Sequence, residues 1–243
     1  MPPVSTYFNA VKDIEGWFYR EDAILFDAIH AIQTDHFITG DLLEIGAYHG
    51  KSAAFLGFLR RPAERFVVCD LFGASAVCRD NQAEQADWYP GLRRQIFERR
   101  YRAIHEELPD ILVCNSRRLK QRARLSRTFR FIHIDGSHLY RIVRQDIRMS
   151  TELLKAGGVV AVDDYRSTHT PGVAAAMWEA VLQRRLTPIC ATPQKMYATA
   201  GGRKIAWFEK LLDWSEGQNE LKVAVEAIPF RRILRFSMSN ACA

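Results

Sequence analysis

Short apolar runs alternate with longer polar and mixed segments through the middle of the chain. The runs are DLLEIG, RFVVCD, DILVCN, FRFIHID and GGVVAVDD, and each of them ends at a polar residue. Because a helix-length segment separates each run from the next, the pattern predicts an α/β fold in which helices cover both faces of a parallel sheet. The polar residues should then meet at one edge of the sheet, where such folds bind ligands: Glu44, Asp70, Asn115, Ser116, Asp135, Asp163 and Asp164.

The two ends of the chain add elements to this core. Helices are expected around residues 6–16 and 21–37, then roughly over 172–185, followed by a strand pair in LTPICAT and KMYATA. The last segment combines the amphipathic stretch KIAWFEKLLDW with the alternating stretch LKVAVEAIPFRRILRF. We therefore expect one domain with additions: an N-terminal helical segment over 1–39 on the substrate side, a cofactor-binding core over 40–200 and an extension over 201–243. The extension is either a dimer contact or an edge strand of the same sheet.

Composition favours a globular protein of the cytoplasm. Of the 243 residues, 48% are hydrophobic, which is enough for a sizeable core. No stretch has the length and apolarity to cross a bilayer, and the first residues do not form a targeting signal. The cysteines are odd in number and lack a C-x-x-C pair, so reduced thiols are expected: Cys69, Cys78, Cys114, Cys190 and Cys242.

The net charge of +6 comes largely from two arginine-rich stretches, residues 93–102 and 117–130. A nucleic-acid surface is one interpretation. In the first stretch, however, apolar residues recur at helical spacing (Ile96, Phe97, Tyr101 and Ile104), which is typical of a helix with an apolar seam and a basic outer face. No aromatic platform is interleaved with the basic residues, so a nucleic-acid partner is disfavoured.

The stretch LLEIGAYHGKSA, residues 42–53, has the pattern of a strand that ends near an acid and turns on glycines into a helix. Gly46 and Gly50 remove side chains where the chain must turn, and the following helix presents free amides beside Glu44. Asp70 ends the next strand, where dinucleotide-binding folds place a carboxylate that accepts hydrogen bonds from ribose hydroxyls. The turn is G-A-Y-H-G rather than G-x-G-x-x-G, which argues against a nicotinamide site.

The stretch EIGAYHGKS, residues 44–52, resembles class I S-adenosylmethionine-dependent methyltransferases, and the resemblance extends over about residues 40–200. It implies a Rossmann-like fold with a mostly parallel central sheet and S-adenosylmethionine as the cofactor. Gly46 and the following backbone would face the methionine end, with Glu44 beneath its ammonium group, Asp70 at the ribose, and Asn115 or Ser116 beside the adenine. The cofactor-binding candidates are Glu44, Gly46, Ala47, Tyr48, Gly50, Ser52, Asp70, Asn115, Ser116 and Asp135.

Asp135, Asp163 and Asp164 end what should be neighbouring strands, in FIHIDGSHLY and GGVVAVDDY. These carboxylates would repel one another unless a positive charge lies between them. Oxygen ligands without cysteine or clustered histidine suit Mg²⁺, or another hard divalent cation such as Mn²⁺, rather than Zn²⁺. The positions also match the metal ligands of catechol O-methyltransferases and of the macrocin and mycinamicin sugar O-methyltransferases. The D-D pair resembles the sugar-directed group more than the D-N pair of the catechol enzymes.

His138 is the candidate general base, because it follows Asp135 by three residues where some of the resembling sugar enzymes have histidine, and its ordinary pKa suits proton transfer near neutrality. Asp135 is the competing base. Among the other histidines, His49 and His169 could face the pocket, whereas His133 should pack within its strand. Candidate substrate residues that could stack on sugar faces or form a lid, with ordinary packing as an equal alternative, are Trp17, Tyr19, Trp88 and Tyr89. Tyr165, directly after the acid pair, is expected to shape the metal pocket on the substrate side.

The leading hypothesis is therefore a homodimeric, Mg²⁺-dependent O-methyltransferase that acts on a hydroxyl of a saccharide or glycosylated natural product. An enzyme acting on a catechol or another vicinal diol is the first alternative. An RNA-binding protein or RNA methyltransferase is the second, although the chain lacks the N-P-P-Y or D-P-P-Y stretch that methylation of base amines favours. A non-catalytic module with the same fold is the third, and the three aspartates argue against it because they would be costly to keep together without a cation.

Overall fold

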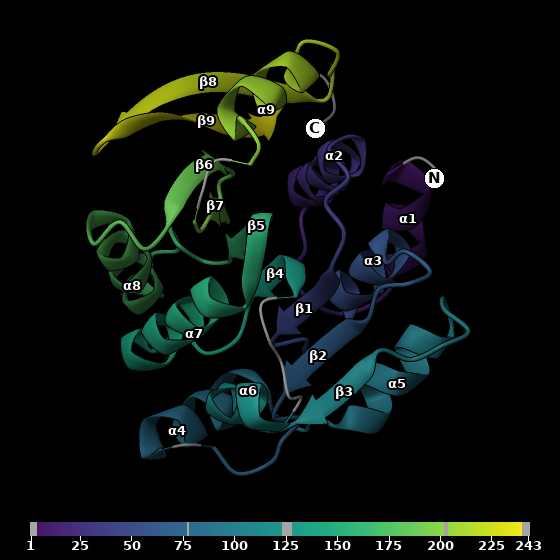
Figure 1. Ribbon diagram of the computed structural model, residues 1–243. Helices are drawn as coiled ribbons and strands as arrows, with labels where there is room; N and C mark the ends of the chain where they lie inside the picture. The colour runs from purple at the N-terminus through teal and green to yellow at the C-terminus, as the bar shows by residue number, and fades with distance from the viewer. Residues whose placement is uncertain (1–3, 77, 123–127, 202–203, 240–243) are drawn as a thin grey trace.

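The computed structural model of the chain describes residues 4–76, 78–122, 128–201 and 204–239 (Figure 1). Cys242 lies outside the described residues, as does part of the second arginine-rich stretch. Within the described chain no disulfide joins two cysteines: Cys69, Cys114 and Cys190 are buried and Cys78 is exposed. The helices of this part are all too short or too polar to cross a membrane.

One sheet of nine strands runs through the described chain in the order β3-β2-β1-β4-β5-β7-β6-β9-β8. Strands β1 to β5 are parallel to their neighbours, and β7 then pairs antiparallel with β5. The chain order reverses between β1 and β4, which is where open α/β sheets bind ligands. The strands are β1 (Asp41–Ile45), β2 (Phe66–Asp70), β3 (Asp110–Val113), β4 (Phe129–Ile134), β5 (Leu154–Val162), β6 (Thr187–Ala191), β7 (Met196–Thr199), β8 (Leu221–Ile228) and β9 (Arg231–Met238).

Helices cover both faces of this sheet, as the alternating pattern predicts (Figure 1). Alternate strand residues enter two separate apolar clusters: Leu42 and Phe131 pack with α1, α2, α3 and α9, whereas Leu43 and Ile132 pack with α7 and α8. The helical elements are α1 (Val4–Val11), α2 (Arg20–Asp35), α3 (Lys51–Leu59), α4 (Arg79–Trp88), α5 (Arg94–Arg102), the 3₁₀ turn η1 (Ser116–Arg118), α6 (Leu119–Arg122), α7 (Tyr140–Leu153), α8 (Pro171–Leu182) and α9 (Trp207–Ser215).

Two helix boundaries differ from the predicted ones. The first helix ends at Val11 rather than near residue 16, and the chain then passes through Gly16 with a φ of 137°, a conformation that no helix contains. Helix α8 ends at Leu182 rather than near residue 185, because Arg184 has a φ of 57°. Hydrophobic spacing locates a helix well, but the left-handed residues that stop it leave little trace in that spacing.

The C-terminal extension continues the sheet. Strands β8 and β9 form an antiparallel hairpin, and β9 pairs parallel to β6 with Leu234 opposite Cys190. This hairpin lies at the top of Figure 1, with α9 beside it. The extension therefore contributes an edge to the same sheet, which is one of the two interpretations of the sequence, and β8 is the outermost strand.

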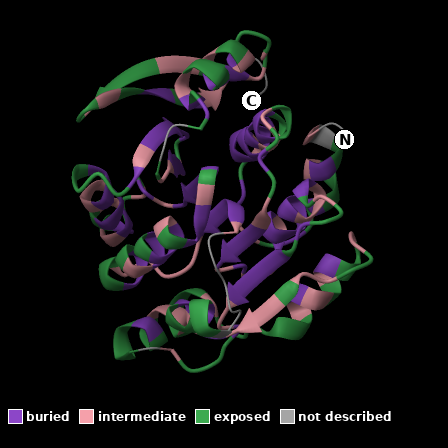
Figure 2. Cartoon of the chain, in the orientation of Figure 1, coloured by how far each residue is buried: buried purple, intermediate pink, exposed green. Residues whose placement is uncertain are grey.

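Both arginine-rich stretches contribute to the packing of the domain. In α5 the rings of Phe97 and Tyr101 are buried while Arg94 and Arg99 are exposed, which confirms the apolar seam and basic outer face. The second stretch ends at Arg130, which is only 1% exposed and donates to Glu64 from Nε at 2.8 Å. Figure 2 shows the same division, with buried central strands and exposed outer helix surfaces.

Candidate functional site

A cavity of about 510 Å³ opens at the carboxyl ends of the central strands. It gathers residues that lie far apart in the sequence, from the β1–α3 turn to the loop after β5. The sequence candidates that line it are Trp17, Tyr19, Gly46, Ala47, Tyr48, Ser52, Asp70, Trp88, Tyr89, Asn115, Ser116, Asp135, His138, Asp163 and Asp164. Glu44, Gly50 and Tyr165 do not line it.

The strand register brings the acidic residues together. The amide of Asp135 donates to the carbonyl of Ile45 at 2.8 Å, and the amide of Asp163 donates to the carbonyl of Ile134 at 2.9 Å. Each of these bonds continues the parallel ladder one residue beyond the strand, so the end of β4 lies between the ends of β1 and β5. Residues that follow these strands therefore face one another across the cavity without any contribution from flexible loops.

Gly46 allows the β1–α3 turn to pass against β4. Its φ is 82°, and a Cβ atom at this position would lie 2.0 Å from the carbonyl oxygen of Asp135. Since that obstacle is backbone, no side-chain rearrangement could make room for it. Gly50, by contrast, is the N-cap of α3 and lies against the ring of Phe97.

Asp70 ties the same turn to the end of β2. Its Oδ2 accepts hydrogen bonds from the amides of Ala47 at 2.7 Å and Tyr48 at 3.1 Å, and its Oδ1 accepts from Phe72 at 2.6 Å. Burial raises the pKa of this carboxyl, while hydrogen bonds from backbone amides act in the opposite direction. The turn is thus held by a carboxylate that also lines the cavity.

Glu44 and His133 form a buried pair behind the cavity wall. Both side chains are 0% exposed, and Oε1 of Glu44 lies 2.8 Å from Nδ1 of His133. Burial raises the pKa of Glu44 to about 8, whereas burial and the charge of Lys195 hold the pKa of His133 well below its usual range. Around neutral pH the Glu44 carboxyl is therefore protonated and the His133 ring is neutral. His133 packs within its strand, as the sequence suggests, and its ring also belongs to this buried polar pair.

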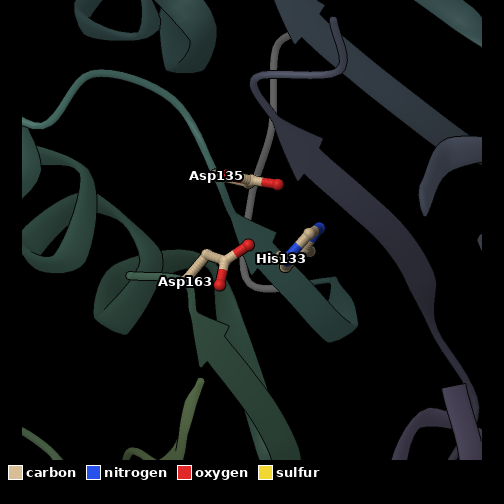
Figure 3. A group of neighbouring side chains, drawn as sticks. All are labelled: His133, Asp135 and Asp163. Carbon is tan, nitrogen blue, oxygen red and sulfur yellow. The ribbon is translucent and has the colours of Figure 1, made fainter. Parts of the chain in front are cut away.

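Asp135 and Asp163 lie beside His133 at the ends of neighbouring strands (Figure 3). One ligand atom from each, together with one from His133, lies within 4.8 Å of the others. Burial raises the pKa of Asp135 well above its usual range, and the negative charge of Asp163 raises it further. In the described part of the chain Nε2 of His133 has no hydrogen-bond partner, so this nitrogen is a polar atom left for a ligand to contact.

Asp164 is directed elsewhere, although it lines the same cavity. Its φ is 58°, an uncommon value for a residue other than glycine, and Ser167 donates to its Oδ1 at 2.5 Å. Its Oδ2 lies 3.1 Å from Nε2 of His138. Backbone strain of this kind is frequently found at functional sites.

His138 lies between two carboxylates. Nδ1 is 3.2 Å from Oε1 of Glu84, and Nε2 is 3.1 Å from Asp164. Burial alone would lower the pKa of His138, but its bonds to Asp164 and Glu84 outweigh burial and raise the pKa to about 10. The ring is therefore an imidazolium at neutral pH in this arrangement.

Two charged residues of the site give little signal in the sequence. Glu84 lies in the polar helix α4 and accepts from Ser137 Oγ and from the amide of His138, both at 2.6 Å. Lys195 is 0% exposed and donates from Nζ to Oδ2 of Asp163. Its one trace in the sequence is a single lysine at the start of the apolar run MYATA.

The far end of the cavity is formed by Asn115, Ser116 and Asp146. The Asn115 side chain accepts from the amide of Arg117 at 3.0 Å and so caps η1. Burial raises the pKa of Asp146 to about 7, against the opposing effect of a hydrogen bond from Ser116. Asp146 comes from the middle of an amphipathic helix, so its position in the sequence gives no indication that it reaches the cavity.

Aromatic residues line the solvent side of the cavity. Trp17 is 59% exposed and Trp88 is 53% exposed, and their rings stack on Tyr48 and His169 at centroid distances of 5.8 Å and 5.7 Å. Tyr89 is half-buried, and its ring centroid lies 5.5 Å from that of Tyr48. Exposed rings over a cavity are available to contact a ligand.

Tyr165 and His49 lie apart from these cavity-lining rings. Tyr165 is 5% exposed, and its hydroxyl donates to the carbonyl of Thr192 at 3.4 Å. It therefore supports the β6–β7 turn and does not shape the cavity wall directly. His49 does not line the cavity but pairs at 3.2 Å with Glu15, which does, and His169 lines the cavity as well.

Comparison with solved structures identifies the fold. The chain superposes on the calicheamicin methyltransferase CalS11 with a TM-score of 0.56 at 18% identity, covering 74% of this chain and 79% of that chain. The O-methyltransferase NovP gives a TM-score of 0.56 at 16% identity, with 74% and 81% covered. The O-methyltransferase TomG from Streptomyces achromogenes gives 0.51 at 16% identity, with 82% and 89% covered. A sequence search against curated proteins finds no match.

A family model described as "Methyltransferase domain" matches residues 43–165, just over half of the chain. The match begins in β1 and ends after the acid pair that follows β5, so it includes the β1–α3 turn, Asp70 and the acidic edge of the sheet. Together with the Rossmann-like arrangement of the sheet and its covering helices, this match shows that the chain belongs to the methyltransferase-domain family and is an S-adenosylmethionine-dependent methyltransferase.

Proposed function

We propose that the protein transfers the methyl group of S-adenosylmethionine to a hydroxyl of a saccharide or of a glycosylated natural product. The observation that carries this proposal is the single cavity in which the β1–α3 turn meets Asp135, Asp163, Asp164 and His138. The turn supplies backbone groups and a carboxylate suited to the cofactor. The acidic edge supplies groups that can position an alcohol and take up its proton, which oxygen methylation requires.

In this proposal the cofactor lies along the ends of β1 and β2, with its methionine part against the backbone of Gly46, Ala47 and Tyr48. Asp70 lines the cavity while its carboxylate accepts hydrogen bonds from the amides of Ala47, Tyr48 and Phe72. In this proposal it also accepts a ribose hydroxyl. Asn115 and Ser116 lie beside the adenine, and Ser52 separates the cofactor from the buried Glu44.

A divalent cation is the second part of the proposal, and the donor set fits one. Within the described chain the Asp135 carboxylate accepts no hydrogen bond, its pKa is raised by burial and by Asp163, and oxygen donors suit Mg²⁺ or Mn²⁺. Asp135, Asp163 and Asp164 would hold the ion. When bound, such an ion polarises an acceptor hydroxyl and lowers its pKa.

The proton of the acceptor is assigned to His138 or Asp135. His138 already carries a proton in this arrangement, so it can act as a base only after releasing that proton, which its contacts with Asp164 and Glu84 oppose. Asp135 is the competing base, because its carboxylate lines the cavity and accepts no hydrogen bond within the described chain. The acceptor itself would contact the exposed rings of Trp17, Tyr19 and Trp88 and the half-buried ring of Tyr89, which are suited to the apolar faces of a sugar.

A saccharide is preferred to a catechol because the D-D pair after β5 resembles the sugar-directed enzymes. CalS11 is a TDP-rhamnose 3'-O-methyltransferase, and its apo structure has a TM-score of 0.52 with this chain. That activity is a property of CalS11, and it supports nucleotide sugars as the first acceptors to try.

The test is transfer of a radiolabelled methyl group from S-adenosylmethionine to a panel of acceptors, with Mg²⁺ and with a chelator. The panel contains nucleotide sugars, glycosides, a catechol and an RNA fragment. Methylation of a sugar hydroxyl that the chelator abolishes is the expected result. Labelling of the catechol alone would move the assignment to the first alternative, and labelling of the RNA would contradict it.

A homodimer belongs to the same proposal. Strand β8 forms one edge of the sheet, and Val225 on it is 49% exposed while Phe230 in the hairpin turn is 64% exposed. An unpaired edge with exposed apolar residues is able to pair with a second copy. Light scattering after size exclusion would give twice the monomer mass for the parent protein and the monomer mass for Val225→Lys.

A further inference from the structure

Lys195 places a positive charge inside the acidic edge. Its side chain is 0% exposed, and its ammonium group donates to Asp163. The charges of Asp163, Asp22 and Asp135 all favour its protonated form and together outweigh the opposing effect of burial, so its pKa is raised. Part of the charge balance that the three aspartates require is therefore already supplied by the chain.

The lysine is held in place by the β6–β7 turn and by α2. Its own amide donates to Oγ1 of Thr192 at 2.8 Å, and the Thr192 hydroxyl donates to Oδ1 of Asp22 at 2.8 Å. Tyr197 donates to the same oxygen of Asp22, also at 2.8 Å. Asp22 is itself 0% exposed, so the ammonium group is enclosed by protein, near a buried acid from α2 and bonded to Asp163 directly after β5.

Both carboxylate oxygens of Asp163 are consequently already bonded to groups of the protein. One of its oxygens binds Lys195, and the other accepts the amide proton of Asp164 at 2.9 Å. A cation that approaches Asp163 must lie near an ammonium group that has no exposed position to which it could move. Like charges in a partly enclosed site repel one another strongly, because water screens them little.

We propose that Lys195 is an internal counter-cation that weakens divalent-cation binding at the acidic edge and keeps the edge folded when no ion is bound. The inference rests on the proposed function only for the location of the ion at Asp135, Asp163 and Asp164. It makes Lys195 a positioning residue that acts through Asp163 and does not touch the acceptor. A second expectation is that Asp135, which has no bond to the lysine, contributes most to holding the ion.

The experiment compares Mn²⁺ binding to the parent protein, Lys195→Met and Lys195→Arg by the loss of the free Mn²⁺ signal in electron paramagnetic resonance. Methionine keeps the length of the side chain and removes its charge, whereas arginine keeps the charge. We expect the dissociation constant to fall by about tenfold or more in Lys195→Met and to stay near the parent value in Lys195→Arg. Lys120→Met, at an exposed lysine paired with Glu152, is the matched control and should leave binding unchanged.

Thermal unfolding gives an independent measure that does not depend on turnover. Without metal, Lys195→Met should melt well below the parent because Asp163 and Asp22 lose their buried partner, and Mn²⁺ should raise its melting temperature more than that of the parent. If Lys195→Met folds only when Mn²⁺ is present, that rescue supports the inference. Adding Asp135→Asn to Lys195→Met should remove the gain in affinity.

Equal or weaker Mn²⁺ binding by Lys195→Met would overturn the inference, and so would its failure to fold at any Mn²⁺ concentration. If neither the parent protein nor any variant bound Mn²⁺, both this inference and the divalent cation of the proposed function would be wrong. Methyl transfer by the parent protein is measured separately, so loss of the inference and loss of the proposed activity remain distinguishable.

Discussion

Nε2 of His138 lies 3.1 Å from Oδ2 of Asp164, while the opposite nitrogen of the ring lies 3.2 Å from Glu84. An imidazolium between two carboxylates predicts a defined pH dependence. The pKa of His138 is about 10 in the fold and 6.5 as its ordinary value, so the stabilisation is fully present below pH 6.5. It is lost as the pH rises through 10, because the folded protein then gives up a proton that the unfolded chain has already released.

Glu84→Gln should therefore lower the pKa of His138 and shift the loss of stability to lower pH. Nuclear magnetic resonance of the labelled ring would follow the titration, and thermal unfolding at several pH values would follow the stability. Glu98→Gln, on the outer face of α5 and paired with Arg94, is the control. An unchanged titration of His138 in Glu84→Gln would contradict the assigned charge state.

Asp70→Asn should weaken S-adenosylmethionine binding by about tenfold or more, since hydrogen bonds to a charged acceptor are the stronger kind. In asparagine an NH₂ group replaces one of the two carboxylate oxygens, and it cannot accept the hydrogen bonds that this oxygen receives, either from Ala47 and Tyr48 or from Phe72. The turn therefore loses part of its anchor. Calorimetric titration with the cofactor measures the effect. Asp41→Asn at the start of β1, where the carboxylate accepts from the amide of Arg65, is the matched control and should bind normally.

Gly46→Ala should destabilise the protein by more than about 3 kcal/mol, because the new Cβ would meet the backbone of Asp135 at 2.0 Å. Gly91→Ala shares a positive φ, 73°, but has nothing within 4 Å of the added atom. It should cost about 1 kcal/mol, the strain of the left-handed conformation alone. Chemical denaturation followed by circular dichroism separates the two, and equal costs would show that close approach has no part in the effect.

Arg130→Met should cost about 3–5 kcal/mol because the buried Glu64 loses the guanidinium group that donates to both of its oxygens. Arg65→Met removes an arginine from a pair with Asp110 in which both side chains are 51% exposed. Its cost should stay below about 1 kcal/mol. Equilibrium unfolding of both variants measures the contrast, and a small effect of Arg130→Met would mean that Glu64 becomes protonated or hydrated in the variant.

The sequence predicts the core of the fold because its strands are buried on both faces and end at polar residues. The five runs correspond to β1 to β5, and the two stretches after α8 correspond to β6 and β7. The role of the C-terminal extension could not be decided in the same way. Alternation in LKVAVEAIPFRRILRF predicts a strand, but it does not say whether that strand's partner is β6 or a second copy of the chain.

Site residues divide along similar lines. Asp70, Asp135 and Asp163 follow apolar strands, so their convergence is a consequence of the sheet and can be anticipated. Glu84 and Lys195 come from a surface helix and from a turn, and only the tertiary arrangement brings them to the acids. The sequence argument correctly required a positive charge beside the aspartates, yet it had no means of recognising that one distant lysine supplies part of it.

The contact between Gly46 and the carbonyl of Asp135 has a consequence for how the two halves of the site move. The peptide that would face the methyl donor and the residue that would face the acceptor touch through main-chain atoms, and a hydrogen bond from Asp135 to Ile45 joins them again. Their separation is thus set by the spacing of two paired strands. None of the aromatic residues on the solvent side takes part in this strand pairing, so a movement of their side chains would leave that separation unchanged.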